Sequence, residues 1–254
     1  MYTFPPADER LQELFDPDLP NSPALWAVLE GKYGGRALVE DRNHPDQCVL
    51  RTDAALTYFS RGTKQNFLDE AVARFLKEGP VWLVWPVHSS LSAPNASEPQ
   101  VIERREFRGC DPDSRTLLDL RNSLPDSAAI QPMDRTLFRQ CEWRSEMIHY
   151  AGSEESFFEH GIGLCLLRGK EILVEAYASA VGNNKAEIGA LTRKNYRGRG
   201  YAPIASAYLI EICRQRRLEV IWSCEADHLA SIRVAQKLGF RTERDYTIYE
   251  YESK

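Results

Sequence analysis

The residues of this sequence best suited to chemistry lie at positions 197–200, where two arginines alternate with two glycines. Glycine lets the backbone approach a ligand closely, and a guanidinium offers several donors to an anion. Arg197, Gly198, Arg199 and Gly200 therefore predict a phosphate site. No Gly-Lys-Ser/Thr follows, which excludes a Walker loop, and the spacing also departs from the dinucleotide fingerprint. An ordinary strand-to-helix turn with solvated arginines is the alternative.

The flanking sequence predicts a strand before this turn and a helix after it. Ala186, Ile188 and Ala190 stand at alternate positions, as on one face of a strand. Beyond the turn, apolar residues recur at helical spacing to about residue 216. Pro203 is tolerated only in a first helical turn, so the helix is expected to begin within two residues of Gly200. Its N-terminus would add unbonded N–H groups and about half a positive charge.

Two motifs resemble the GNAT superfamily of acyl-CoA-dependent N-acyltransferases. The pattern Arg197-x-x-Gly200-x-Ala202 is similar to the loop that holds the pyrophosphate of coenzyme A in that family. The segment 230–240 resembles the family's helix ending in Lys-Leu-Gly-Phe. Combined with Gly-Asn-Asn-Lys-Ala-Glu-Ile-Gly at 182–189, it also resembles the zwittermicin-resistance-type acetyltransferase branch. The resemblance covers about residues 140–254, and the first half only in general plan.

The resemblance implies an α/β (α+β) fold with a mixed, splayed central sheet flanked by helices. Strands expected at 162–167, 172–181 and 186–192, joined by turns at 168–170 and 182–184, agree with it. Two domains are expected: an N-terminal α+β region, 1–135, and a GNAT acetyltransferase domain, 136–254. The first is interpreted as a degenerate GNAT-like copy or as a separate cap over the substrate cleft. Residues 1–20, rich in proline and acids, are expected at the surface.

The resemblance also implies acetyl-CoA as a co-substrate and assigns residues to it. The pantetheine arm would lie against Leu191 and Thr192, where their strand separates from the strand at 220–223. His228 and Ser231 stand near the start of the following helix at positions that would face the cofactor, with a surface histidine as the alternative for His228. The pyrophosphate would be held by the loop residues Arg197, Gly198, Arg199, Gly200, Tyr201 and Ala202.

For catalysis, several members of the family carry a working glutamate on the central strand, at the position of Glu187. Glu187 would take a proton from the acceptor ammonium, directly or through water. A core glutamate bonded to a neighbour is the alternative. Glu175, on the neighbouring strand, is the second candidate base. A backbone N–H near Leu191 or Thr192 would hold the carbonyl oxygen. The family's usual tyrosine acid is replaced by Ala235, and Cys224, Tyr196 or water would take its place.

Composition limits the partners and the location of this protein. A net charge of −5 over 254 residues argues against general nucleic-acid binding. No apolar run is long enough to cross a membrane, and no secretory signal is seen at the N-terminus. Six scattered cysteines without a C-x-x-C pair predict a reducing, cytoplasmic setting and no metal site. The sequence leaves the oligomeric state open, with a homodimer as one option.

Three functions remain open at this point. The first is an N-acetyltransferase that moves an acetyl group from acetyl-CoA to a primary amine of a small molecule, by direct attack in a ternary complex. The second is a non-catalytic acyl-CoA-binding module, which the replaced tyrosine favours. The third is a protein or peptide N-acyltransferase. The sequence does not identify the acceptor amine.

Overall fold

The computed structural model describes residues 1–86 and 89–253. They form two compact units. The first contains Met1–Arg104 and Asp245–Lys254, and the second contains Arg105–Arg244. Compactness alone does not test which segments fold as domains. The division into 1–135 and 136–254 therefore stays a prediction.

The second unit is built on an antiparallel meander of four strands. These are β7 (Ala129–Pro132), β8 (Ile162–Arg168), β9 (Glu171–Gly182) and β10 (Lys185–Thr192). Two tight turns join the last three strands. Gly169 has a φ of 62°, and Asn183 and Asn184 have φ values of 50° and 54°, the left-handed conformations favoured in two-residue hairpin turns. The predictions of these three strands and two turns are confirmed to within a few residues.

A helical crossover follows the meander. Helix α8 (Tyr201–Gln215) connects β10 to β11 (Glu219–Glu225), which pairs with β10 in parallel. The helix begins one residue after Gly200, as its sequence predicted. Helix α9 (Leu229–Lys237) comes next, and β12 (Arg241–Tyr251) is the last strand. The strand order in this unit is β6-β11-β10-β9-β8-β7, in which β6 spans Gln100–Arg108.

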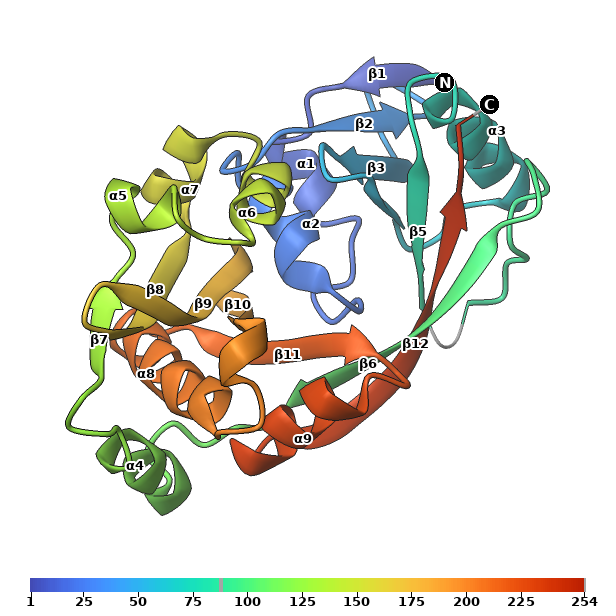
Figure 1. Ribbon diagram of the computed structural model, residues 1–254. Coiled ribbons are helices and arrows are strands. Elements are labelled where there is room, and N and C mark those ends of the chain that lie inside the picture. The colour runs from blue at the N-terminus through green and yellow to red at the C-terminus, as the bar shows by residue number, and fades with distance from the viewer. Residues whose placement is uncertain (87–88, 254) are drawn as a thin grey trace. The chain divides into compact units, whose positions relative to one another are not determined.

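Helices cover both faces of this sheet (Figure 1). On one face α8 packs on β8, β9 and β10, and α4 (Arg115–Asn122) packs on α8. Small side chains such as Ala176, Ala178 and Ala186 form the sheet side of this core and let the helix approach closely. On the other face α6 (Arg144–Ala151) packs on β9 and on α7 (Glu154–His160), with α5 (Arg135–Phe138) before them in the chain.

The strands of the first unit follow the order β1-β2-β3-β4-β5-β12, with both antiparallel and parallel pairs. Leu11 and Phe15 are buried in this unit, so the expectation that residues 1–20 lie at the surface is wrong. Proline and acidic residues mark the turns there, whereas these two apolar side chains enter the core. The elements are β1 (Tyr2–Phe4), α1 (Glu9–Gln12), α2 (Ser22–Leu29), β2 (Gly35–Val39), β3 (Cys48–Thr52), β4 (Leu56–Phe59), α3 (Gln65–Phe75) and β5 (Val81–Trp85).

The two units repeat one pattern of strand pairing. In the first unit, β1–β2, β2–β3 and β3–β4 are antiparallel, and β4 pairs in parallel with β5 after helix α3. In the second, β7–β8, β8–β9 and β9–β10 are antiparallel, and β10 pairs in parallel with β11 after α8. This repeat favours the interpretation of the N-terminal region as a GNAT-like copy rather than a separate cap.

Candidate active site

Strand β10 separates from β11 halfway along its length. Pairing with β11 runs from Lys185 to Ile188, opposite Glu219 to Trp222. Pairing with β9 on the other side continues to Thr192, with a register shift between Glu187 and Ile188. Within the described pairing, the segment from Gly189 to Thr192 therefore has no partner strand on its β11 side. An extended ligand could add to this edge as a further strand, and Leu191 and Thr192 lie on it.

The loop after β10 presents a row of unbonded backbone donors. It contains a single 3₁₀ turn, Lys194–Tyr196, and two glycines in left-handed conformation, Gly198 at φ 76° and Gly200 at φ 79°. Gly200 is the N-cap of α8 and supplies no capping side chain. Across the described chain, the N–H groups of residues 198–202 donate to no protein acceptor. Five consecutive unbonded N–H groups at a helix N-terminus are donors of the kind that an anion accepts from.

The arginines of this loop have distinct surroundings. Arg197 Nε donates to the carbonyl oxygen of Thr192 at 3.1 Å, so this side chain braces the loop against the end of β10. The Arg199 guanidinium carbon lies 5.6 Å from the centre of the Tyr196 ring, and that of Arg168 lies 5.1 Å from it. Arg168 also donates to the Tyr196 hydroxyl at 3.0 Å. These contacts hold the loop without using its N–H groups.

One cation near the loop was missed from the sequence. A Cβ added to Gly200 would meet the ammonium of Lys237 at 4.0 Å, so the last residue of α9 places a positive charge beside the helix N-terminus. The signal was present, since Lys237 is the lysine of the Lys-Leu-Gly-Phe motif. The motif predicts the helix and its end, whereas the approach of its lysine to Gly200 depends on how α9 packs.

The two candidate bases lie on the sheet face opposite α8. Alternation along β9 and β10 places Ala176, Ala178 and Ile188 in the α8 core, so Glu175 and Glu187 face the side of α6. Both carboxylates are buried, with exposed fractions of 0% for Glu175 and 8% for Glu187. The structure thus brings both side chains to one face, although they differ in their contacts.

Glu175 is engaged by backbone donors. Its two carboxylate oxygens accept hydrogen bonds from the N–H groups of Glu142, at 2.7 Å, and Trp143, at 3.0 Å. Arg193 Nη2 lies 3.9 Å from the same carboxylate and also donates to the carbonyl oxygen of Gln140 at 2.5 Å. Burial raises the pKa of Glu175, and the two N–H groups and Arg193 oppose that rise. Glu175 therefore ties the start of α6 to the end of β10, where Arg193 lies.

Glu187 lies where β10 shifts register against β9. Its Cα is opposite Ala180 on β9 and Ile221 on β11, and its carbonyl oxygen accepts a bond from the Ser179 hydroxyl at 3.2 Å. The residue thus sits two positions before the edge at Gly189–Thr192. The carboxylate therefore belongs to the paired part of β10, next to the point where β11 separates.

Helix α9 and the residue before it carry the remaining residues that the sequence assigned to the cofactor or to the acid position. Ser231 accepts a hydrogen bond from Trp222 Nε1 at 2.9 Å, so its hydroxyl is used within the protein. His228 is the N-cap residue of α9, is exposed and makes no side-chain capping bond. Ala235 is fully buried in the core. At the position of the family's tyrosine, the chain therefore offers no proton donor.

The equivalent loop of the first unit is closed by its own hydrogen bonds. It is only five residues long, Ser60 to Lys64, between β4 and α3. The N–H of Lys64, the N-cap of α3, donates to the side-chain oxygen of Gln47 at 2.7 Å, and the hydroxyls of Ser60 and Thr63 lie 3.0 Å apart. This loop therefore lacks the row of unbonded donors found before α8.

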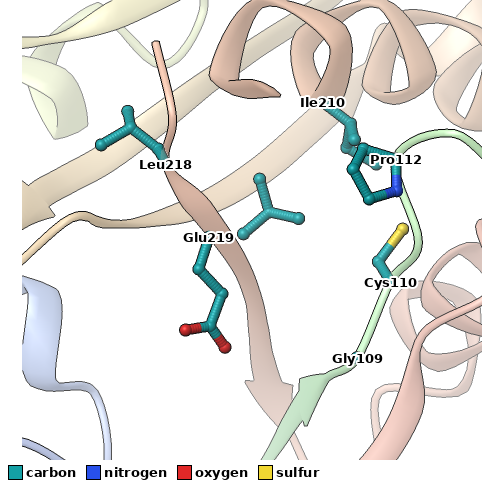
Figure 2. Close-up of a pocket in the computed structure, with 7 residues that line it drawn as sticks. Gly109, Cys110, Pro112, Ile210, Leu218 and Glu219 are labelled. Carbon is teal, nitrogen blue, oxygen red and sulfur yellow. The ribbon is translucent and has the colours of Figure 1, made fainter. Parts of the chain in front are cut away.

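A small cavity of about 190 Å³ lies away from these residues (Figure 2). It is near the start of β11, beside α8 and the end of β6, and includes Cys110 and Glu219 in its lining. None of its seven lining residues is a predicted site residue. Among the described residues, no group of three or more His, Cys, Asp or Glu could hold a metal ion, and no helix there is long and apolar enough to cross a membrane.

Comparison with known proteins extends the likeness to the whole chain. A family model described as GNAT acetyltransferase matches residues 12–249. An uncharacterized N-acetyltransferase of Bacillus subtilis (strain 168), YdfB, is 34% identical over 237 residues, which cover 89% of this chain and 88% of that protein. The family match begins at residue 12, in the first unit. In that unit the sequence resembles the family only in the order of its predicted helices and strands.

Solved structures share the fold. A GCN5-related N-acetyltransferase-like protein from Streptococcus suis 89/1591 has a TM-score of 0.70 at 24% identity and covers 96% of this chain and 97% of its own. A tandem GNAT protein from the clavulanic acid biosynthesis pathway has a TM-score of 0.65 at 10% identity, covering 98% and 93%. From the family match and the Bacillus relative, this chain belongs to the GNAT acetyltransferase family.

Proposed function

We propose that this protein transfers an acetyl group from acetyl-CoA to a primary amine of a small molecule, within a ternary complex. The observation that carries the proposal is the row of five unbonded N–H groups at residues 198–202, directly after the strand edge at Gly189–Thr192. A loop of donors and an open edge fit a ligand with a phosphate part and an extended, amide-bearing arm. We also place the chain in the zwittermicin-resistance-type branch, on the motifs at 182–189 and 230–240.

The residues divide between the two parts of the donor. The N–H groups of Gly198, Gly200 and Ala202, with those of Arg199 and Tyr201, would hold the pyrophosphate, assisted by the α8 dipole and the ammonium of Lys237. Leu191 and Thr192 would pair their backbone groups with the pantetheine arm. His228 lies exposed at the start of α9 and could reach a cofactor phosphate, whereas Ser231 is bonded to Trp222 and would serve by packing.

Glu187 is proposed as the base. It would accept a proton from the acceptor ammonium, directly or through water, so that the amine can attack the thioester carbon. The C–N bond forms, the C–S bond breaks, and a backbone N–H near Leu191 or Thr192 would stabilise the charge on the carbonyl oxygen. Because Ala235 supplies no donor, water would carry the proton that the new amide nitrogen loses to the departing thiolate. Glu175 is the second candidate, but its bonds to two N–H groups fit a positioning role better.

Thiol release and calorimetry together test this function. Acetyl-CoA is titrated into the protein, and release of the coenzyme A thiol is then followed with a panel of small primary amines. The proposal expects binding and an amine-dependent release. The buried Ala235 favours one alternative, a non-catalytic acyl-CoA-binding module. That alternative holds if acetyl-CoA binds and no amine accelerates thiol release, and absence of binding contradicts both.

The cysteines are the observation that bears on location. All six are free thiols in the structure, which fits a reducing compartment. We therefore place the reaction in the cytoplasm. Labelling the cysteines of protein from intact cells, after denaturation because five of the six thiols are buried, would test this, and thiols blocked in disulfides would contradict it.

A further inference from the structure

Tyr177 is a buried phenol whose hydroxyl has no partner. The residue is 4% exposed and lies on β9, on the sheet face that α6 covers. Its ring packs edge-on against Trp143, with centroids 5.7 Å apart at 82°, and against Phe157 at 6.5 Å. Within the described residues, the hydroxyl makes no hydrogen bond. It does not belong to the fully enclosed polar atoms that lack a partner, so it reaches solvent. Tyrosine hydroxyls usually find a partner, and this one is open to a ligand.

Carboxylates lie on the same side of the sheet as this hydroxyl. Glu146 comes three residues after Trp143, whose ring contacts Tyr177. Burial raises the pKa of Tyr177, and the neighbouring Tyr150, Glu146, Glu187 and Glu175 raise it further. Glu146 and Tyr150 are one turn apart on α6, so both project from the same side of that helix. Glu146 is exposed and makes no ion pair in the described part of the chain. Its charge is therefore available to a cation beside Tyr177.

The backbone leaves room at this point. Gly189 is the residue of β10 directly opposite Tyr177, and a Cβ added there would meet only the Trp143 ring, at 4.0 Å. Gly189 is also the first residue of the edge that β11 leaves open. The unpartnered hydroxyl and the free carboxylate thus lie beside the place where the acetyl group would be delivered.

We infer that Tyr177 and Glu146 bind the ammonium group of the acceptor, which makes the acceptor an alkylamine that is cationic at neutral pH. This inference rests on the proposed function. The ammonium donates to the Tyr177 hydroxyl oxygen and pairs with the Glu146 carboxylate, and Glu187 then receives its proton. An arylamine is neutral at the same pH, offers weaker donors and gains no ion pair. The subsite therefore selects alkylamines over arylamines.

The test uses the whole protein with acetyl-CoA and a panel split between alkylamines, such as benzylamine, and arylamines, such as aniline. The best acceptor is carried to the variants Tyr177→Phe, which keeps the ring packing, and Glu146→Gln. Tyr208→Phe is the matched control, since its hydroxyl bonds to the carbonyl oxygen of Arg121 on the opposite sheet face. Acetyl-CoA affinity is measured on every variant by calorimetry.

The expected best acceptor is an alkylamine. Loss of one hydrogen bond or ion pair to a charged group is expected to raise its KM about ten- to a hundredfold in Tyr177→Phe and in Glu146→Gln. Acetyl-CoA affinity and kcat stay within about threefold, because only acceptor binding is lost. An arylamine as best acceptor, or KM values equal to Tyr208→Phe, would each overturn the inference. Failure of acetyl-CoA binding in the wild type, or binding with no amine acceptor at all, would instead remove the proposed function and the inference with it.

Discussion

Replacing Glu175 by alanine is expected to loosen the start of α6. The carboxylate, fully buried, accepts the N–H groups of Glu142 and Trp143 at 2.7 and 3.0 Å. An N–H left without its acceptor costs about 1–3 kcal/mol. Water can reach this partly exposed segment, so the two together are expected to cost about 2–4 kcal/mol. The local opening of residues 140–151 would then be about 30- to 1,000-fold more frequent.

Hydrogen–deuterium exchange of that segment measures this opening directly. Glu175→Ala should exchange about 30- to 1,000-fold faster there, and Glu175→Gln, which keeps one acceptor oxygen, should lie between it and the wild type. Glu171→Ala is the matched control, since Glu171 begins the same strand and its contacts lie at the surface, an ion pair with Arg168 at 3.6 Å and a hydrogen bond with the Tyr196 hydroxyl. Exchange equal to the control would refute the positioning role. If Glu175→Gln abolished turnover while hydrogen–deuterium exchange of residues 140–151 stayed at the wild-type rate, Glu175 would be the base.

Three further outcomes are expected. Gly198→Glu should weaken acetyl-CoA binding at least about 30-fold, because the new charge repels the phosphates by about 2 kcal/mol or more. Gly62→Glu is the matched control and should not weaken binding, since Gly62 has a φ of 75° against 76° for Gly198 and equally open space around it. Equal calorimetric dissociation constants for the two variants would exclude residues 198–202 as the phosphate site. Glu187→Gln should lower kcat about 10²- to 10⁴-fold with cofactor affinity unchanged, and turnover unchanged at every pH would remove it as the base. Because burial raises the folded pKa of Glu175 above 4.5, the pH-dependent part of its contribution to stability is complete below pH 4.5 and is lost as pH rises through the folded pKa. Wild-type stability in urea should therefore fall relative to Glu175→Gln over that window, and the opposite slope would contradict this.

The elements of the second half could be predicted because their signals are local. Gly169 and the pair Asn183–Asn184 mark turns that need positive φ, and Pro203 fixes the start of α8. The anion loop follows from the same local chemistry. Each of these signals spans only a few residues, so a single sequence contains it completely.

The contacts that a sequence does not contain are the distant ones. Glu175 meets N–H groups 32 and 33 residues earlier in the chain, and no local pattern indicates that a carboxylate will be used in this way. The environment of Tyr177 depends on α6 and β10 together, and the position of Lys237 beside Gly200 depends on how α9 packs. The pairing of β12 with β5 joins segments about 160 residues apart, which periodicity cannot show.

Calorimetric titration of the wild-type protein with acetyl-CoA tests the central claim most directly. The donors of the loop before α8 are unbonded, whereas the loop at Ser60–Lys64 is closed by Gln47 and its own hydroxyls. Binding at one site per chain is therefore expected. No measurable binding would contradict the assignment of residues 198–202 to a coenzyme A phosphate. Two equivalent sites per chain would contradict the distinction between the two loops.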